Sequence, residues 1–208
     1  MRVTGGELKG RQLLSGFANH VRPSTDRVRE SLFNSLQNKI DFSESNILDL
    51  FSGSGIIALE FLSRKAKFVT SVDVDKKNVN FQKTLREEWH ILGTKPSSTP
   101  PDSLAIGPWD IIAADVWKYI PKIITENQFD LIFADPPYHM PNLQQLPHLL
   151  IPALNQQNPN ALLLIEHKPQ IQFPITPSTS KDYGSSIISF FQPWALYSLL
   201  LSHIANTP

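Results

Sequence analysis

The chain has 208 residues, of which 41% are hydrophobic, and its 19 Lys and Arg balance 19 Asp and Glu. These values are typical of one globular domain with a substantial core, and they exclude a disordered or collagen-like chain. There is no cysteine, which excludes a disulfide framework, a thiolate metal site and a cysteine nucleophile. We see no long apolar signal segment and no membrane-spanning stretch, and therefore expect a cytoplasmic protein.

Positive charge is concentrated at the beginning of the chain. Residues 1–40 hold seven Lys or Arg and three acidic residues, a surplus of four positive charges. Glycines among them indicate a hairpin or turn-rich arm, and residues 22–26 indicate a loop that ends in a helix cap. Apolar residues then follow at helical spacing: Val28, Leu32, Phe33, Leu36 and Ile40. Such a basic segment is either a phosphate-contacting surface or an ordinary solvated helix face.

Beyond residue 40, strand-like apolar runs alternate with helical patterns. Strands are expected at 47–50, 68–72, 110–114, 129–134, 161–165 and 187–191, and helices after residue 55, at 76–88 and within 142–157. The alternation predicts an α/β, Rossmann-like fold with a mostly parallel central sheet, helices on both faces, a C-terminal antiparallel strand and a small N-terminal extension. We expect a loop at 93–108, a basic arm and helix at 1–40, a main domain at 41–192 and an apolar tail of unassigned role at 193–208.

The segment Asp49-Leu-Phe-Ser-Gly-Ser-Gly55 has the strand, glycine turn and helix of a nucleotide-type cofactor site. Glycines let the backbone approach a ligand, and the following helix presents free N–H groups. Ala58 stands where a dinucleotide fingerprint ends in glycine or alanine, so an NAD site stays open. Asp49 argues against it, because a carboxylate would repel a pyrophosphate but suit a cationic sulfonium. The candidate ligand-binding residues of this segment are Asp49, Phe51, Ser52, Gly53, Ser54 and Gly55.

Two further acidic residues close neighbouring strands. Asp73, followed by Val74, ends the second strand, where a carboxylate can accept hydrogen bonds from ribose hydroxyls. Asp115, followed by Val116, ends the third strand and could accept from an adenine amine. Each acid alone is more simply a capping or solvated carboxylate. Together with the glycine turn on one sheet edge, the acids favour S-adenosyl-L-methionine as the cofactor.

Residues 135–138 read Asp-Pro-Pro-Tyr and come directly after the apolar run 129–134. Two prolines stop a strand, because neither can donate a ladder hydrogen bond and each fixes its own φ. The rigid turn presents a carboxylate, bare carbonyls and a ring at the carboxyl edge, where open α/β sheets bind ligands. It suits holding a flat, amino-bearing ring. Equally, the prolines could simply end the strand and leave Tyr138 on the surface.

Four stretches resemble, in order, the bacterial 16S ribosomal RNA guanine-N2 methyltransferase family of the RsmD type. They are MRVTGGELKGR at 1–11, RPSTDRVRESLFN at 22–34, DLFSGSG at 49–55 and FDLIFADPPY at 129–138. The second is the most discriminating, because many methyltransferases share the last two. The resemblance covers roughly residues 1–191. Ala58 and Lys65 stand where that family pattern has glycine.

The resemblance implies a methyltransferase fold in which residues 41–192 form the catalytic domain. The implied reaction moves a methyl group from S-adenosylmethionine to an exocyclic guanine amine in small-subunit RNA. Asp135 and the Pro136 carbonyl would accept the two N–H groups of the amine, Pro137 would supply rigidity, and Tyr138 would stack on the extruded base. The predicted RNA-binding residues are Lys9, Arg11, Arg22, Arg27 and Arg29. For the last three a second role stays open, because the resemblance implies that the block 23–30 borders the methionine end of the cofactor and the substrate entrance. The implied partner is 16S rRNA in small-subunit particles, with no metal, no membrane and no inferable protein partner.

Three alternatives stay open at this point. A DNA adenine-N6 methyltransferase can carry the same Asp-Pro-Pro-Tyr turn, but it needs an added module to read bases, for which the chain has little room. A protein-glutamine methyltransferase would be expected to have Asn in place of Asp135. A non-catalytic RNA-binding assembly protein could keep a relic pocket, although the intact Asp49, Gly53 and Gly55 argue against decay.

Overall fold

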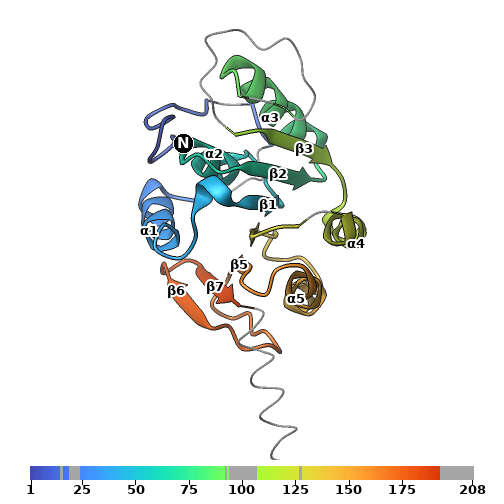
Figure 1. The fold of residues 1–208 in the computed structure, drawn as a ribbon. Helices are drawn as coiled ribbons and strands as arrows, with labels where there is room; N and C mark the ends of the chain where they lie inside the picture. Colours follow the sequence, from blue (N-terminus) through green and yellow to red (C-terminus); the bar gives the residue numbers. More distant parts are fainter. Residues whose placement is uncertain (15, 19–23, 92, 94–106, 127, 193–208) are drawn as a thin grey trace, which may run out of the picture. The chain divides into compact units, whose positions relative to one another are not determined.

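The computed structural model describes residues 1–14, 16–18, 24–91, 93, 107–126 and 128–192 (Figure 1). The tail 193–208, most of the loop expected at 93–108, and Arg22 lie outside the described residues. The chain forms two compact units, Met1–Lys118 and Tyr119–Pro208. Among the described residues, no helix combines the length and the apolar character needed to cross a bilayer.

The first unit is built on three parallel strands in the order β3-β2-β1. The strands are β1 (Asn46–Leu50), β2 (Phe68–Asp73) and β3 (Trp109–Ala113), joined by α2 (Ile56–Ser63) and α3 (Lys76–Glu88). Every residue of α2 is buried, so this helix is covered on all sides rather than on one face. The parallel pairing confirms the predicted α/β architecture, and the predicted helix 76–88 is confirmed to the residue.

Helix α1 (Asp26–Leu36) begins where the sequence predicts a cap. The Thr25 hydroxyl accepts a hydrogen bond from the Val28 N–H at 3.3 Å, which satisfies one of the orphan donors of the first turn. The helix ends at Leu36, four residues before Ile40, and the short helix η1 (Phe42–Glu44) follows. The rings of Phe33, Phe42 and Phe61 pack edge to face, with centroids 4.7–6.1 Å apart. This aromatic cluster fixes α1 on α2.

The N-terminal arm folds back on itself, as its glycines predict, with an antiparallel bridge between Arg2 and Gln12. It docks on the end of α2. The Ser63 carbonyl accepts the Glu7 N–H at 2.7 Å, and the Ser63 hydroxyl accepts the Leu8 N–H at 2.8 Å. Gly6 has φ +75°, and a Cβ there would lie 1.9 Å from the Ser63 oxygen. Only glycine therefore lets the arm approach the helix this closely.

The buried carboxylate of Glu60 joins the arm, α1 and α2. One oxygen accepts from the Thr4 N–H at 2.9 Å and from Arg29 Nε at 3.0 Å. The other accepts from the Thr4 hydroxyl at 2.9 Å and from the Arg64 guanidinium. Because both oxygens are paired with donors and cations, the charge is tolerated at a site with no exposed surface.

Helix α2 ends in a Schellman motif that places Lys65 in the left-handed region. The Ala66 N–H reaches the Phe61 carbonyl at 3.1 Å, and the Lys65 N–H reaches the Leu62 carbonyl at 2.9 Å. Lys65 has φ +67°, a conformation that glycine adopts without strain. The lysine is held there partly by an exposed ion pair with Glu7, 3.0 Å away. Lys65, which stands where the family pattern has glycine, therefore forms a strained C-terminal cap of α2.

Replacing Lys65 with glycine should stabilise the protein. Relief of the left-handed conformation outweighs the loss of an exposed ion pair, and we expect a gain of about 0.5–1 kcal/mol in the free energy of unfolding. Urea denaturation of Lys65→Gly and of the matched control Glu7→Gln measures the two contributions separately. A glycine variant less stable than Glu7→Gln would show that Lys65 carries no strain.

The second unit pairs its strands in the order β4-β5-β7-β6. They are β4 (Leu131–Ala134), β5 (Leu162–His167), β6 (Thr179–Asp182) and β7 (Ile187–Phe191), with η2 (Leu143–Gln145) and α5 (Leu146–Gln157) between β4 and β5. Strands β4 and β5 are parallel, whereas β7 is antiparallel to both β5 and β6. The predicted antiparallel C-terminal strand is therefore confirmed.

Besides the short helix η1, the sequence did not predict α4 (Val116–Glu126) or β6. Helix α4 contains Pro121, a residue that usually argues against a helix interior. Strand β6 consists of Thr, Ser, Lys and Asp and is mostly exposed, so it lacks the apolar signature of a strand. It forms through backbone pairing with β7.

Candidate functional site

The glycine turn connects the buried end of β1 to α2. Phe51, Gly53 and Gly55 all have positive φ, at 59°, 53° and 77°. A Cβ at Gly55 would lie 2.9 Å from Gln82 Cγ and 3.0 Å from the Trp109 ring, so the position has no room for a side chain. The turn is closed by the Gly55 N–H, which donates to the Ser52 carbonyl at 2.8 Å. Residues 52–55 are buried and Phe51 is half-buried.

Asp49, on β1, is a buried acid with an unsatisfied oxygen. It is 1% exposed, and its Oδ2 has no hydrogen-bond partner. Burial raises the pKa of the Asp49 carboxyl well above its usual range, a hydrogen bond from the Ala58 backbone opposes this, and the nearby charge of Asp73 adds to it. A buried acceptor without a donor is costly for folding, and strongly shifted acids gather at functional sites.

Asp73, at the end of β2, holds the glycine turn. Its Oδ2 accepts the Gly53 N–H at 2.7 Å, and its Oδ1 accepts the Asp75 N–H at 2.8 Å and the Asn78 amide at 3.4 Å. The structure therefore gives this carboxylate a role in shaping the turn. Beside it, Val74 is 68% exposed, an uncommon position for a large apolar side chain. An exposed valine next to this acid is suited to pack against a flat apolar ring.

Asp115 lies between β3 and α4, directly before the first residue of the helix. Its Oδ1 accepts the Trp117 N–H at 3.0 Å, which is the capping contact that the sequence left open. Its side chain is exposed, while Val116 is buried. A ligand contact at Val116 would therefore come from its backbone.

The double-proline turn directly follows β4. Pro136 is buried, Pro137 is exposed, and Asp135 and Tyr138 are half-buried. The Pro137 carbonyl accepts the Met140 N–H at 2.8 Å, which closes the turn. The segment is thus a defined corner at the carboxyl end of a strand, as predicted.

Glu166, in β5, and Lys168, directly after it, contact Tyr138. The sequence alone assigned neither residue a role. The Tyr138 hydroxyl donates to Glu166 at 3.5 Å, and the Lys168 ammonium lies 5.2 Å from the centre of the ring. Their position in the sequence could have indicated this contact, because β5 runs parallel to β4 and both strands end at the same edge of the sheet. Next to them, burial lowers the pKa of His167, whose ring bonds Ser189 and the Lys168 carbonyl, so this histidine favours its neutral form.

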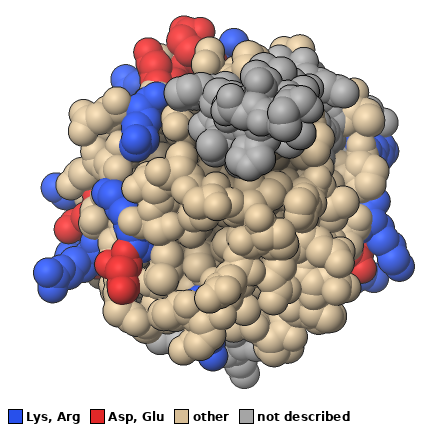
Figure 2. Space-filling model, turned by 90° about the horizontal axis from the view of Figure 1, so that it is seen from below, with Lys and Arg blue, Asp and Glu red and all other residues tan. Residues whose placement is uncertain are grey.

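The predicted RNA-binding residues that the structure describes differ in exposure. Lys9, Arg11 and Arg27 are exposed, and the Arg11 guanidinium lies 5.3 Å from the centre of the Trp89 ring. Figure 2 shows a face on which the coloured Lys and Arg side chains lie mainly at the margin. Exposed cations can neutralise phosphates, so Lys9, Arg11 and Arg27 stay candidates for RNA contact.

Arg29 corrects the sequence prediction. Its side chain has no exposed surface, and it bonds Glu60, Asp26 and the Arg2 carbonyl. It belongs to the buried face of α1, together with Leu32. The prediction that Arg29 contacts RNA is therefore wrong, because its guanidinium is used inside the protein. The hydrogen bond from Arg2 is the main cause that lowers the pKa of Asp26, and Arg29 adds to it.

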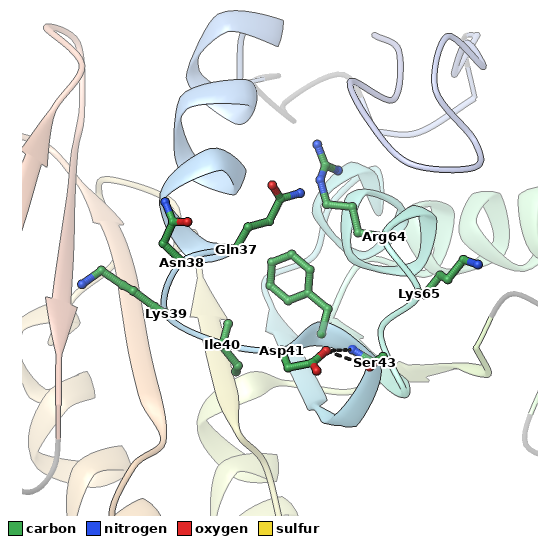
Figure 3. A pocket seen from close by; sticks show the side chains of 9 residues that line it. Gln37, Asn38, Lys39, Ile40, Asp41, Ser43, Arg64 and Lys65 are labelled. Atoms are coloured by element: carbon green, nitrogen blue, oxygen red, sulfur yellow. Dashed lines mark hydrogen bonds between the residues drawn. The ribbon is translucent and has the colours of Figure 1, made fainter.

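A cavity of about 600 Å³ lies where α1, η1 and the end of α2 meet (Figure 3). Its lining runs from Gln37 to Ser43 and includes Arg64 and Lys65. In Figure 3, Lys39 and Lys65 point away from it in opposite directions. None of the predicted ligand-binding or catalytic residues is in this lining, so the cavity is separate from the glycine turn.

Comparison with proteins of known structure defines the class of protein. A Haemophilus influenzae protein is 29% identical with a TM-score of 0.62, and the match covers 92% of this chain and 97% of the other. An rRNA methyltransferase from Streptomyces viridochromogenes shares the fold at 14% identity, with a TM-score of 0.62 and coverage of 88% and 90%. The fold is therefore the Rossmann-like fold of methyltransferases, as predicted.

Sequence comparison identifies the family. The family described as Conserved hypothetical protein 95 matches residues 1–192. Ribosomal RNA small subunit methyltransferase D of Haemophilus influenzae is 33% identical over 193 residues, which is 91% of each chain. The corresponding protein of Buchnera aphidicola is 30% identical over 85% of this chain and 81% of its own. The chain belongs to this family, the ribosomal RNA small subunit methyltransferase D family, which confirms the resemblance read from the sequence.

Asp49→Asn should stabilise the free protein at neutral pH. With a raised pKa, the folded state retains a proton that the unfolded chain has already lost, so stability falls as pH rises from the ordinary titration range of Asp to the raised value. Asparagine carries no charge and removes this loss. Thermal unfolding between pH 4 and pH 8 should show a higher midpoint for Asp49→Asn at neutral pH and convergence with the wild type in acid. A variant less stable than the wild type at pH 8 would contradict the assigned pKa direction.

Proposed function

We propose that the protein transfers a methyl group from S-adenosyl-L-methionine to the exocyclic N2 amine of a guanine in 16S ribosomal RNA. The observation that carries the proposal is the turn Asp-Pro-Pro-Tyr at the end of β4, in a chain of the methyltransferase D family. The names of its relatives support rRNA as the substrate class. The guanine and its N2 atom are the more specific part of the proposal, and they rest on the resemblance.

The glycine-turn residues fit the proposed cofactor. The unsatisfied Asp49 oxygen and its buried position suit a cationic group, since a bound ammonium or sulfonium would lower the cost of the buried charge. The proposed ligands are Asp49, the turn from Phe51 to Gly55, Asp73 with Val74, and Asp115 with the backbone of Val116. Exposed Val74 would pack on the adenine ring. When bound, S-adenosylmethionine supplies an electrophilic methyl group.

In the proposed reaction Asp135 and Pro136 act on the guanine amine. The amine lone pair is delocalised into the purine, so acceptors for its two N–H groups must turn it out of conjugation. The Asp135 carboxylate accepts one N–H and the Pro136 carbonyl accepts the other, and the carboxylate also stabilises the positive charge that develops on nitrogen. The rigid prolines hold both acceptors in place.

Tyr138 is the proposed platform for the extruded base. Glu166 and Lys168 contact its hydroxyl and its ring, which limits the rotation of the side chain. A base stacked on an aromatic ring gains about 1–3 kcal/mol, which offsets part of the cost of removing it from its RNA stack.

The proposal is tested by incubating the protein, labelled cofactor and small-subunit particles that lack the modification. Incorporation at one guanine N2, mapped by digestion, is the expected result. Incorporation of label at adenine N6 in DNA would instead support a DNA adenine-N6 methyltransferase. Absence of label from every substrate, with cofactor binding intact, would support a non-catalytic binding protein.

Asp135→Ala should lower kcat by roughly 10²–10³, because one acceptor of the developing charge is lost. The cofactor Kd measured by calorimetry should stay close to the wild-type value, since Asp135 is proposed to contact the base. Asp135→Asn is the matched control, because its amide oxygen keeps an acceptor but loses the charge, and it should fall between the two. Near-normal turnover of the alanine variant would overturn the role.

Lys9 and Arg11 are the arm cations proposed to contact RNA phosphates. Changing both to glutamine should weaken RNA binding and reduce the slope of log K against log salt by roughly 0.7–0.9 for each phosphate that the variant no longer neutralises. Lys118→Gln, an exposed cation outside the predicted set, is the control. An unchanged slope in the double variant would assign Lys9 and Arg11 to an ordinary solvated surface.

A further inference from the structure

Gln82, on α3, donates two hydrogen bonds to the glycine turn. Its side chain is fully buried, and its Nε2 donates to the Ser52 hydroxyl and to the Gly53 carbonyl, both at 2.8 Å. It uses both amide hydrogens on two consecutive residues of the turn. It lies 30 positions from Ser52 in the sequence, and no motif marks it.

The same side chain carries an unsatisfied atom. Gln82 Oε1 is buried without a hydrogen-bond partner. Burying an unpaired carbonyl lowers stability, and methionine would fill the same volume without this cost. Stability alone therefore does not explain a glutamine at this position, whereas its two donated hydrogen bonds do explain it.

These bonds fix the orientation of a peptide group in the turn. The Gly53 N–H donates to Asp73, and the Gly53 carbonyl accepts from Gln82, so Gly53 is held on both sides. Because a trans peptide is planar, its C=O and the following N–H point in opposite directions. Drawing the Gly53 carbonyl towards α3 therefore turns the Ser54 N–H away from α3. Gly53 is one of the residues with positive φ, so its peptide could otherwise rotate with little steric resistance.

We propose that Gln82 is a positioning residue that sets the glycine turn in its cofactor-binding conformation. This inference rests on the proposed cofactor site, and it adds a residue of α3 to that site. Gln82 acts through Ser52 and Gly53 and does not itself need to touch the ligand. Its contribution is preorganisation, because a turn already held in the binding conformation loses less freedom on binding.

Gln82→Met is the first test. It removes both donors and the unsatisfied carbonyl while keeping side-chain volume, so the midpoint of thermal unfolding should change little. The Kd for S-adenosylmethionine, measured by calorimetry, should rise roughly tenfold. Lys83→Met, the exposed neighbour on α3, is the matched control and should leave the Kd unchanged. An unchanged Kd in Gln82→Met would overturn the inference.

Gln82→Glu gives a readout that general loosening of the fold would not give. An ionised glutamate faces the Gly53 carbonyl with a second acceptor and repels it, whereas a protonated glutamate can donate to it. Burial raises the pKa of a glutamate, which brings its protonation into an accessible range. The ratio of variant to wild-type Kd should therefore fall as pH is lowered from 8 to 5. Asp73 on β2 bonds the turn, Asp49 on β1 lies near Asp73, and Arg86 on α3 bonds the carbonyl of Trp109, whose ring packs against Gly55. Both proteins carry these groups, so the ratio of the two Kd values removes the pH dependence that they contribute by themselves.

The outcomes separate this inference from the proposed function. A wild-type protein that binds no S-adenosylmethionine contradicts the cofactor proposal itself. A wild-type protein that binds it, with a pH-independent ratio for Gln82→Glu, overturns only the role of Gln82. If Gln82→Met does not fold, Gln82→Glu at low pH carries the test, with circular dichroism as the check on folding.

Discussion

The buried carboxylate of Glu60 is the interaction on which the first unit depends. It takes donors from Thr4 in the arm, Arg29 in α1 and Arg64 at the end of α2, so three segments distant in sequence meet at one charge. Removing one partner from such a buried ion pair leaves an uncompensated charge, which costs about 3–5 kcal/mol in other proteins. The arrangement is therefore cooperative: the arm, α1 and α2 stay together or separate together. The arm cations Lys9 and Arg11 owe their fixed position to this contact and to the neighbouring Ser63 bonds.

The glycine turn differs from the fully paired Glu60, because its surroundings include buried polar atoms without partners, which lower the stability of the free protein. Asp49 and Gln82 each bury an acceptor without a donor, and burial together with the nearby charge of Asp73 raises the pKa of Asp49. Sites of this kind trade stability for ligand affinity, since the cost carried by the free protein is recovered when a complementary group binds. Asp73 and Gln82 hold the turn from two elements, β2 and α3. The turn is therefore rigid before any ligand arrives, which suits a cofactor that must be bound in one orientation.

The double-proline corner of the second unit is rigid for a different reason. The prolines fix the backbone locally, whereas the Tyr138 ring is fixed by Glu166 and Lys168 from the neighbouring strand. Lys168 covers the ring as a cation, which polarises it and favours an electron-rich base as its stacking partner. The chemistry proposed for Asp135 thus relies on local covalent stiffness, and the stacking proposed for Tyr138 relies on tertiary contacts. The two can be disturbed independently by mutation.

The sequence by itself determined the apolar strands of both units, the cap at Thr25, the glycine turn, the double-proline corner and the family. Each of these is written in local residue patterns, such as alternating apolar runs or residues that fix φ. It did not determine α4, whose Pro121 hides the helical pattern, or β6, whose polar residues form a strand only by pairing with β7. It also misassigned Arg29, because a positive charge is normally solvated and only the tertiary structure supplies Glu60 as its buried partner. The tertiary structure alone decided the roles of Glu60, Gln82 and Lys168, since hydrogen bonds and cation–π contacts across long sequence separations leave no local pattern in the chain.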